Sequence, residues 1–202
     1  MSYWCKNIPL PQDYKQRTEE IMRKNLRKAR SLAIKANQIK RKQYFQEINN
    51  VNDPIAQNIY DHDTAKIALA MLCLGEASKY NPKTRPAFTL GNSDARIITI
   101  FLELLKQCFR FDIEKIRCTV QCRADQDTKA LETFWMDVTG IPKRLFYKPH
   151  IDPRTKGKPT KKPNYKGVLR IDYFDSKVQH DLESLANLIY NILAKRARSL
   201  NG

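Results

Sequence analysis

Apolar and polar positions are arranged differently in the N-terminal quarter of the chain and in the rest of it. From Asp13 to about Glu47 there is no proline or glycine, and Ala, Leu, Lys, Arg and Gln dominate. This composition predicts one long helix. Its apolar residues form only a thin stripe, namely Ile21, Met22, Leu26, Ala29, Leu32, Ala33 and Ala36. A stripe so narrow predicts a helix that stays largely in contact with solvent.

A second helix, predicted from Thr64 as its cap to about Ala77, is apolar on almost every side. Such a helix must be buried, either in a core or against a second copy of itself. Its small residues would let another helix backbone approach closely, and they are Ala68, Ala70 and Gly75. Glu76 stands where the apolar run stops. The plain interpretation is a core helix that ends in a solvated carboxylate, and the alternative is a pair of carboxylates brought together near a two-fold axis.

Beyond this helix the pattern predicts alternating strands and amphipathic helices. Residues 116–123 alternate strictly, with Ile116, Cys118, Val120 and Cys122 on one face of a strand. We predict further strands at 85–90, 145–151 and 167–174, helices at 93–109, 127–138 and 176–198 with Ser93 and Ser176 as caps, and a polar connector at 49–63. Residues 145–151 and 167–174 are expected to form a hairpin with a long, flexible, basic tip.

These elements predict an α+β fold. We expect a mixed or antiparallel sheet with helices on one face, preceded by a long basic helix. The division along the chain is a lead-in and helical extension at 1–50, followed by a domain at 60–198.

Charge narrows the choice of partner. The 202 residues include 37 Lys and Arg and 21 Asp and Glu, for a net charge of +16 and a pI near 9.7. Residues 15–42 hold eleven basic side chains and two acidic ones, and residues 143–166 hold nine and one. Such local density is typical of phosphate binding. The basic stretches lack the large apolar face that inserts into lipid, and no run of 18 apolar residues exists, so no membrane association is expected.

Nucleic acid is therefore the expected partner, and the residues divide into two groups. The polar face of the strand at 116–123 offers base-reading side chains, namely Arg117, Thr119, Gln121 and Arg123. The basic clusters offer phosphate contacts, namely Arg27, Lys28, Arg30, Lys148, Arg154, Lys156, Lys158, Lys161, Lys162 and Arg170. The first five residues lack the features of a signal peptide, which predicts a cytoplasmic, nucleoid-associated protein.

Two patterns suggest metal binding, and a structural interpretation is favoured for both. Cys118 and Cys122 have CxxxC spacing, but no second pair or nearby histidine completes a zinc site, so buried, reduced thiols are predicted. His62 lies between two aspartates, Asp61 and Asp63, where a helix-capping turn is favoured over a metal site. The three histidines, His62, His150 and His180, could also serve as acid–base groups.

The adjacent aromatic residues Phe134 and Trp135 could stack on nucleic-acid bases. An amphipathic helix normally turns such residues towards the core, and we predict that position for both.

The segment Leu69–Ala77 resembles the signature helix of the LAGLIDADG homing endonucleases, in the variant that ends Gly-Glu-Gly. The matching residues are Leu69, Ala70, Leu72, Gly75 and Glu76, and the departures are Met71, Leu74 and Ala77. Residues 89–94 and 167–176 are similar to a strand-to-helix turn and to the last strand of that fold. Residues 134–135, 139–142 and 146–149 are similar to an uncharacterised prokaryotic group, in which a helix-turn-helix ends in a segment like 4–10. The resemblance spans about residues 3–193.

This resemblance implies a half-saddle fold that works as a homodimer on double-stranded DNA, because single-motif members of the family pair. It also implies that Glu76 of each subunit holds Mg²⁺ between the scissile phosphates, with Arg170 or Lys166 stabilising the charge of the reacting phosphate. Retention of Glu76 favours a metal-dependent endonuclease. The departures favour a non-catalytic DNA-binding regulator on the same fold. RNA or intron binding is a third possibility that the charge also fits.

Overall fold

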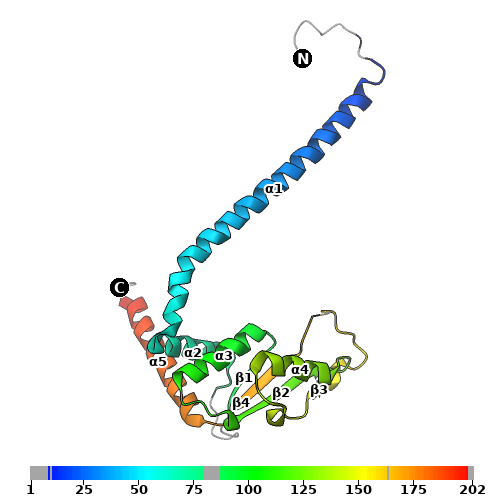
Figure 1. Ribbon diagram of the computed structural model, residues 1–202. Coiled ribbons are helices and arrows are strands. Elements are labelled where there is room, and N and C mark those ends of the chain that lie inside the picture. Colours follow the sequence, from blue (N-terminus) through cyan, green and yellow to red (C-terminus); the bar gives the residue numbers. More distant parts are fainter. Residues whose placement is uncertain (1–8, 10, 80–86, 163, 200–202) are drawn as a thin grey trace. The chain divides into compact units, whose positions relative to one another are not determined.

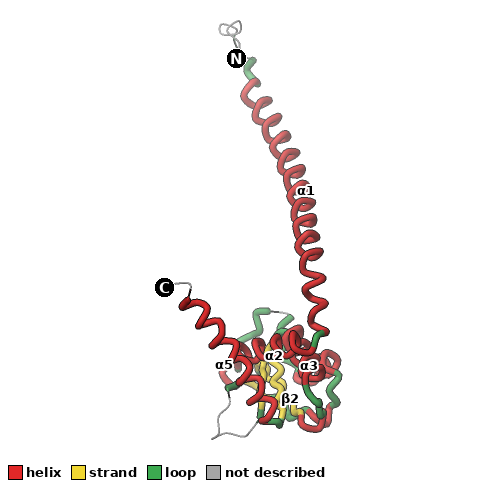
Figure 2. The backbone as a smooth tube through the Cα atoms, turned by 90° about the vertical axis from the view of Figure 1, so that its left-hand side faces the viewer, coloured by secondary structure: helices red, strands yellow, loops and turns green. Residues whose placement is uncertain are grey.

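The first element of the structure is one exposed helix. The computed structural model describes residues 9, 11–79, 87–162 and 164–199, and the chain divides into two units, Met1–Gln57 and Asn58–Gly202. In the first unit, helix α1 runs without interruption over Tyr14–Gln57 (Figures 1 and 2). None of its residues is buried. The predicted exposed helix is confirmed. Of the predicted lead-in and helical extension at 1–50, residues 1–8 and 10 lie outside the described residues.

Helix α1 is ten residues longer than its predicted end at Glu47. The predicted connector at 49–63 is therefore wrong for most of its length, because 49–57 belong to α1 and the next helix begins at His62. The helix continues through Pro54, which lies within its last four residues. Proline there removes only one backbone hydrogen bond, close to an end where several carbonyls lack helical partners in any case. The 3₁₀ turn Asn58–Tyr60 follows at the start of the second unit.

The second unit is an α+β domain with a mixed four-stranded sheet, as predicted. Its elements are α2 (His62–Glu76), β1 (Phe88–Asn92), α3 (Ala95–Cys108), β2 (Ile116–Arg123), α4 (Thr128–Thr139), β3 (His150–Asp152), β4 (Val168–Tyr173) and α5 (Ser176–Ser199). Of the strand predicted at 85–90, residues 85 and 86 lie outside the described residues, and β1 extends two residues past its predicted end.

The strands lie in the order β1-β4-β2-β3. Strand β4 is antiparallel to both β1 and β2, whereas β3 is parallel to β2. The predicted hairpin between 145–151 and 167–174 is therefore wrong. Both edges of β4 are already hydrogen-bonded, so the short β3 pairs with the remaining edge of β2. Most of the strand predicted from Leu145 is instead a 3₁₀ turn, Lys143–Leu145, and irregular chain.

One face of the sheet is buried under helices. In β2 the buried and half-exposed residues alternate along all eight positions, as predicted. Helices α3 and α4 lie across the strands, and their apolar residues join the core (Figure 1). Trp135 of α4 is fully buried and donates its indole N–H to the Lys166 carbonyl oxygen at 2.8 Å, while Phe134 is half-buried. The core placement is thus confirmed for Trp135 and holds in part for Phe134.

Aspartates begin the helices, in place of the predicted Thr64, Ser93 and Ser176. The carboxylate of Asp61 accepts the Thr64 amide at 2.8 Å, that of Asp94 accepts the Arg96 amide, and that of Asp175 accepts the Lys177 amide. A charged acceptor interacts more strongly with the N–H groups and the dipole of a helix N-terminus than a hydroxyl does. Each predicted helix start is nearly right, and each predicted cap is wrong.

The cap of α3 gives a pH-dependent prediction. Hydrogen bonds from the Arg96 side chain and amide lower the pKa of Asp94 from 3.8 to about 2. Because the folded-state pKa is depressed, the stabilisation from Asp94 is fully present above about pH 4 and is lost as the pH falls through 2. A carboxyl NMR titration should show a midpoint near 2 that moves towards 3.8 in Arg96→Ala. A midpoint of 3.8 in the unaltered chain would contradict the cap.

A glycine sets the start of β4. Gly167 has φ +70°, and a Cβ there would lie 2.6 Å from the Gln121 carbonyl oxygen. Gly157 has nearly the same φ, +72°, with open space around it. We expect Gly157→Ala to cost about 1–2 kcal/mol from backbone strain alone, and Gly167→Ala to cost roughly 2 kcal/mol more because backbone atoms must also move. Urea unfolding of the two variants measures the difference, and equal losses would show that the close approach is unimportant.

Candidate nucleic-acid interface

The face of the sheet opposite the helices is open to solvent. Alternation along β1, β2 and β4 directs every second side chain to it. These residues line a shallow hollow of about 710 Å³ and include Thr89, Thr119, Gln121, Val168, Arg170 and Asp172, with Tyr147 at one side. Strand register places Thr119 opposite Arg170, and Gln121 opposite Val168. The predicted pair Thr119 and Gln121 therefore shares a surface with Arg170.

A hydrogen-bonded network fixes the direction of Arg170. The Asp172 carboxylate, whose side chain is only 8% exposed, accepts from Arg170 Nε at 3.0 Å and from the Thr89 hydroxyl at 2.5 Å. The Arg170 side chain itself is 46% exposed. A guanidinium held at one side and exposed at the other is pre-organised to donate to a ligand. Asp172 and Thr89 were not among the predicted site residues, although alternation with Arg170 along the strand was a signal for Asp172.

Arg117 and Arg123, predicted to read bases, bind the chain itself. Arg117 Nη1 donates to the carbonyl oxygens of Glu114 at 2.9 Å and of Ile116 at 2.6 Å. Arg123 Nη2 donates to the Lys158 carbonyl oxygen at 2.6 Å. Both guanidinium groups thus donate hydrogen bonds to backbone carbonyl oxygens, Arg117 near the start of β2 and Arg123 at its end. Strand alternation places both residues on the same face of β2 as Thr119 and Gln121, but their guanidinium groups are already bound to backbone oxygens of the chain.

The basic loop after β3 is attached to the turn after β2, contrary to the prediction of a flexible tip. Asp125 accepts the amide of Thr160 at 2.5 Å and its hydroxyl at 2.8 Å. Gln126 donates to the Tyr165 carbonyl oxygen at 2.7 Å. The Thr160 amide is the largest cause of a lowered pKa at Asp125, so this carboxylate stays charged at neutral pH. Neither Asp125 nor Gln126 was among the predicted site residues.

The predicted phosphate-binding residues of this region are exposed. Within the described part of the chain, no ion pair involves the lysines of the loop or of the segment before it, namely Lys148, Lys156, Lys158, Lys161 and Lys162. Arg154 instead pairs with Asp152, with Nε 2.9 Å from the carboxylate. The remaining predicted residues, Arg27, Lys28 and Arg30, are exposed on α1 in the other unit.

The described helices include none that combines the length and the apolar character needed to span a lipid bilayer.

Glu76, the predicted metal ligand, is exposed at the end of α2. Its Oε2 accepts from the Asn92 side-chain amide at 2.8 Å, so the carboxylate is held at the end of β1. The next residue, Ala77, forms a bridge with Leu90, and the Ser78 amide donates to the Thr89 carbonyl oxygen at 2.8 Å. These contacts join the end of α2 to β1. Asn92 is a positioning residue that the sequence did not reveal.

The two basic residues predicted to act with Glu76 have other partners. Lys166 places its ammonium group 5.4 Å from the centre of the Phe134 ring, and Arg170 is bound to Asp172. In the described part of the chain, no three His, Cys, Asp or Glu side chains lie close enough to hold a metal ion. Glu76 is therefore a positioned carboxylate with no further His, Cys, Asp or Glu ligands gathered around it among the described residues.

The two metal-like sequence patterns have structural roles. Asp61 caps α2, and the His62 ring contacts Asp63 at 3.2 Å, which agrees with the favoured capping turn. Cys118 and Cys122 are buried free thiols. Burial raises the pKa of Cys118 to about 12, as it does for Cys73, so both remain protonated thiols. His150 and His180 are exposed.

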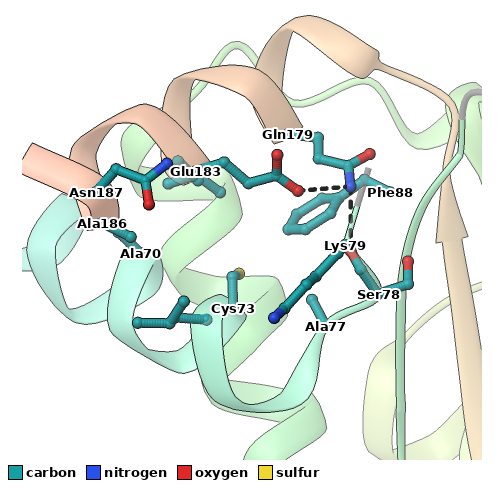
Figure 3. Close-up of a pocket in the computed structure, with 12 residues that line it drawn as sticks. Ala70, Cys73, Ala77, Ser78, Lys79, Phe88, Gln179, Glu183, Ala186 and Asn187 are labelled. Atoms are coloured by element: carbon teal, nitrogen blue, oxygen red, sulfur yellow. Dashed lines mark hydrogen bonds between the residues drawn. The ribbon is translucent and has the colours of Figure 1, made fainter. Parts of the chain in front are cut away.

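A cavity of about 220 Å³ lies between the end of α2 and α5 (Figure 3). The buried Gln179 spans its edge, donating to the Ser78 carbonyl oxygen at 3.1 Å and to Glu183 Oε1 at 3.0 Å. Gln179 thus ties the chain just after Glu76 to α5. This contact adds a second anchor for the segment that follows the carboxylate.

Helix α2 is not buried on all sides within one chain. Its inner face packs against α3 and α5, but Ile67 is 45% exposed, Leu74 is 55% exposed, and Met71 between them is half-buried. A Cβ on the neighbouring Gly75 would meet no atom within 4 Å. Helix α5 carries further exposed apolar residues beyond its buried part, namely Leu188, Tyr190, Ile192 and Leu193.

Comparison with known proteins yields no relative. Searches with protein-family models, with curated proteins and with solved structures gave no match to the chain. The LAGLIDADG resemblance therefore rests on the residues that carry it.

Proposed function

We propose that this chain binds double-stranded DNA through the open face of its sheet. The observation that carries the proposal is a solvent-facing surface where Thr119, Gln121 and the positioned Arg170 lie together, next to a loop of exposed lysines tied to the same sheet. Side chains of this kind on strands can donate to and accept from base edges. The lysines and the net charge of +16 supply phosphate contacts.

The arrangement favours a duplex over a single strand. Hydrogen-bonding side chains dominate the open face, whereas single-stranded nucleic acids are usually held by rows of stacked aromatic rings. RNA remains a competitor to be tested directly.

The functional form proposed is a homodimer with the exposed apolar stripe of α2 at its centre. A second copy of α2 would cover Ile67, Met71 and Leu74, and the open space at Gly75 permits close approach of a helix. Each subunit would then contribute half of a saddle to one continuous DNA-binding surface. This is the half-saddle arrangement that the LAGLIDADG resemblance implies.

Metal-dependent DNA cleavage is a second proposed activity, favoured by the placement of Glu76. One carboxylate held by Asn92 fits Mg²⁺ only if the other subunit and the DNA phosphates supply the remaining oxygen ligands. The metal would supply activation of water and charge neutralisation at the phosphate. Cleavage thus depends on the dimer, while binding does not require it. A non-catalytic regulator is the alternative that the same surface allows.

The binding proposal is tested by titrating duplex DNA, single-stranded DNA and duplex RNA at several salt concentrations. With about six phosphate contacts per chain, the slope of log K against log salt should be about −5 for each subunit bound to the DNA duplex. A flat salt response, or preference for either competitor, would contradict the proposal.

The role of the open sheet face is tested by alanine substitution of two threonines, one on that face and one elsewhere. Thr119→Ala on the open face should reduce the preference for a selected target sequence about fivefold to a hundredfold. Thr133→Ala, on an exposed position of α4, should leave that preference unchanged. Equal effects of the two changes would mean that the reading surface lies elsewhere.

A further inference from the structure

Helix α1 carries two apolar quartets with the same spacing. The first is Met22, Leu26, Ala29 and Ala33, and the second is Tyr44, Ile48, Val51 and Ile55. Both follow the order four, three, four residues, so at about 100° per residue all eight side chains fall within one arc of roughly 120°. The stripe is exposed: Met22 and Val51 are each 65% accessible, and no residue of α1 is buried.

Basic residues occupy much of the remaining arc of the helix, among them Arg23, Lys24, Arg27, Lys28, Lys35, Arg41 and Lys42. Whatever covers the apolar stripe therefore leaves these side chains accessible. Packing of an amphipathic face, more than intrinsic propensity, supplies most of the stability of helices in proteins. A 44-residue helix with an unburied stripe thus lacks its usual source of stability until a partner covers the stripe.

We propose that α1 pairs with α1 of a second copy of this chain in an antiparallel arrangement. Reversing one helix sets the first quartet of each copy against the second quartet of the other in register. Met22 then faces Ile55, and Leu26 faces Val51. The two alanines, Ala29 and Ala33, face Ile48 and Tyr44, so small residues meet large ones, as close packing requires. The contact extends over 34 residues of each helix, about 50 Å.

Charge decides between the two orientations. Residues 14–42 of α1 hold eleven basic side chains and two acidic ones, a net charge of +9, whereas residues 43–57 hold no Lys or Arg and two acids, a net charge of −2. Parallel pairing would place the two +9 segments side by side. Antiparallel pairing places each +9 segment beside a −2 segment, which reduces repulsion and adds attraction.

A second copy fits the stripe better than a lipid surface does. The middle of the stripe consists of Ala29, Ala33 and Ala36, which offer little area to a membrane but allow two helix backbones to approach closely. Lys40 also lies on the stripe, where it would oppose insertion into lipid. The proposal does not depend on DNA binding or on the contact through α2.

Cysteine cross-linking of the full chain, without DNA, tests the pairing and its direction. In the double variant Ala29→Cys/Ile48→Cys, the two cysteines of one helix are about 28 Å apart, so a disulfide between them must join two copies. We expect mild oxidation to give a covalent dimer in which peptide mass spectrometry finds residue 29 linked to residue 48. The control Lys24→Cys/Asp53→Cys keeps the same symmetric register on the opposite side of the helix and should not cross-link.

The outcomes are distinct. Cross-linking of the single variant Ala29→Cys to itself would mean parallel helices and would overturn the proposed orientation. Absence of a disulfide between residues 29 and 48 at tens of micromolar protein would overturn the pairing. Binding of the chain to anionic vesicles through α1, without the disulfide-linked dimer, would overturn it as well. Adding Val51→Glu to the double variant Ala29→Cys/Ile48→Cys should reduce the yield of the disulfide between residues 29 and 48 at least tenfold. Ile34→Glu, which alters a residue of similar exposure outside the stripe, should not reduce it.

Discussion

Under the proposed metal-dependent cleavage, replacing Glu76 with Gln should abolish the activity, with a loss of at least about a hundredfold, and leave DNA affinity unchanged or higher. Gln keeps the shape of the side chain and its contact with Asn92 but removes the charge that attracts the cation. Removal of residues that only support metal ligands commonly costs 10–100-fold, so loss of a ligand should cost at least as much. Affinity for DNA should not fall, because a carboxylate near a phosphate repels it when no metal lies between them.

Cleavage and binding must be measured on the same preparations. Glu103→Gln, at an exposed glutamate of α3 that pairs with Lys106, removes an equal charge from another helix and should change neither activity. If the unaltered chain binds DNA but does not cleave it with Mg²⁺, it is the non-catalytic binder. If Glu76→Gln unfolds the domain, Glu76 is a structural residue and the metal proposal is wrong.

Neutralising Lys161 and Lys162 together should weaken binding to all DNA sequences by about a thousandfold at 0.1 M salt. In a dimer this change removes four phosphate contacts, each of which contributes about 0.9 to the salt slope. The slope should therefore become shallower by about 3.6. Specificity should stay the same, because phosphates carry no base information. Titrations of target and random duplexes at several salt concentrations measure both quantities.

The matched control is neutralisation of Lys177 and Lys195, two exposed lysines of α5, which removes the same charge away from the loop. Equal effects of the two double variants would show a general effect of net charge and would remove the loop from the interface.

Asp125→Asn separates the position of the loop from its charge. The change adds one positive charge, which by itself would raise DNA affinity. It also removes the charged acceptor of the Thr160 amide and hydroxyl, so the loop should loosen and affinity should fall. A rise in affinity would mean that the anchoring of the loop is irrelevant to binding.

Local pattern predicted the elements of this protein well. Strict alternation over 116–123 identified β2 and its buried face, and the absence of proline and glycine identified most of α1. These features depend on neighbours in sequence, because the periods of strand and helix determine which side chains share a face. The helix starts were predicted nearly correctly, but the capping residues were wrong. Several side-chain oxygens near each helix start compete to accept the same backbone amide.

The candidate site was predictable only in part. The sequence placed Thr119 and Gln121 on one face of a strand, and that face proved to be open. It could not show that Arg117 and Arg123 donate to the chain's own carbonyl groups, or that Asp172 holds Arg170. Only the contact of Arg123 with Lys158 joins segments that are distant in sequence. Arg117 and Arg170 bind residues one to three positions away, and whether such a side chain turns to its neighbours or to solvent depends on what surrounds the strand in the fold.

The sequence by itself determined the exposed helix, the α+β class, the basic charge and the alternation that makes one sheet face polar. Only the tertiary structure decided that β3 joins the free edge of β2, because strand pairing depends on which edges remain unpaired once the sheet has formed. It also decided that the basic loop is tied down by Asp125 and that Asn92 holds Glu76. Periodicity acts over a few residues, whereas edge competition and hydrogen bonding between distant segments exist only in the folded chain.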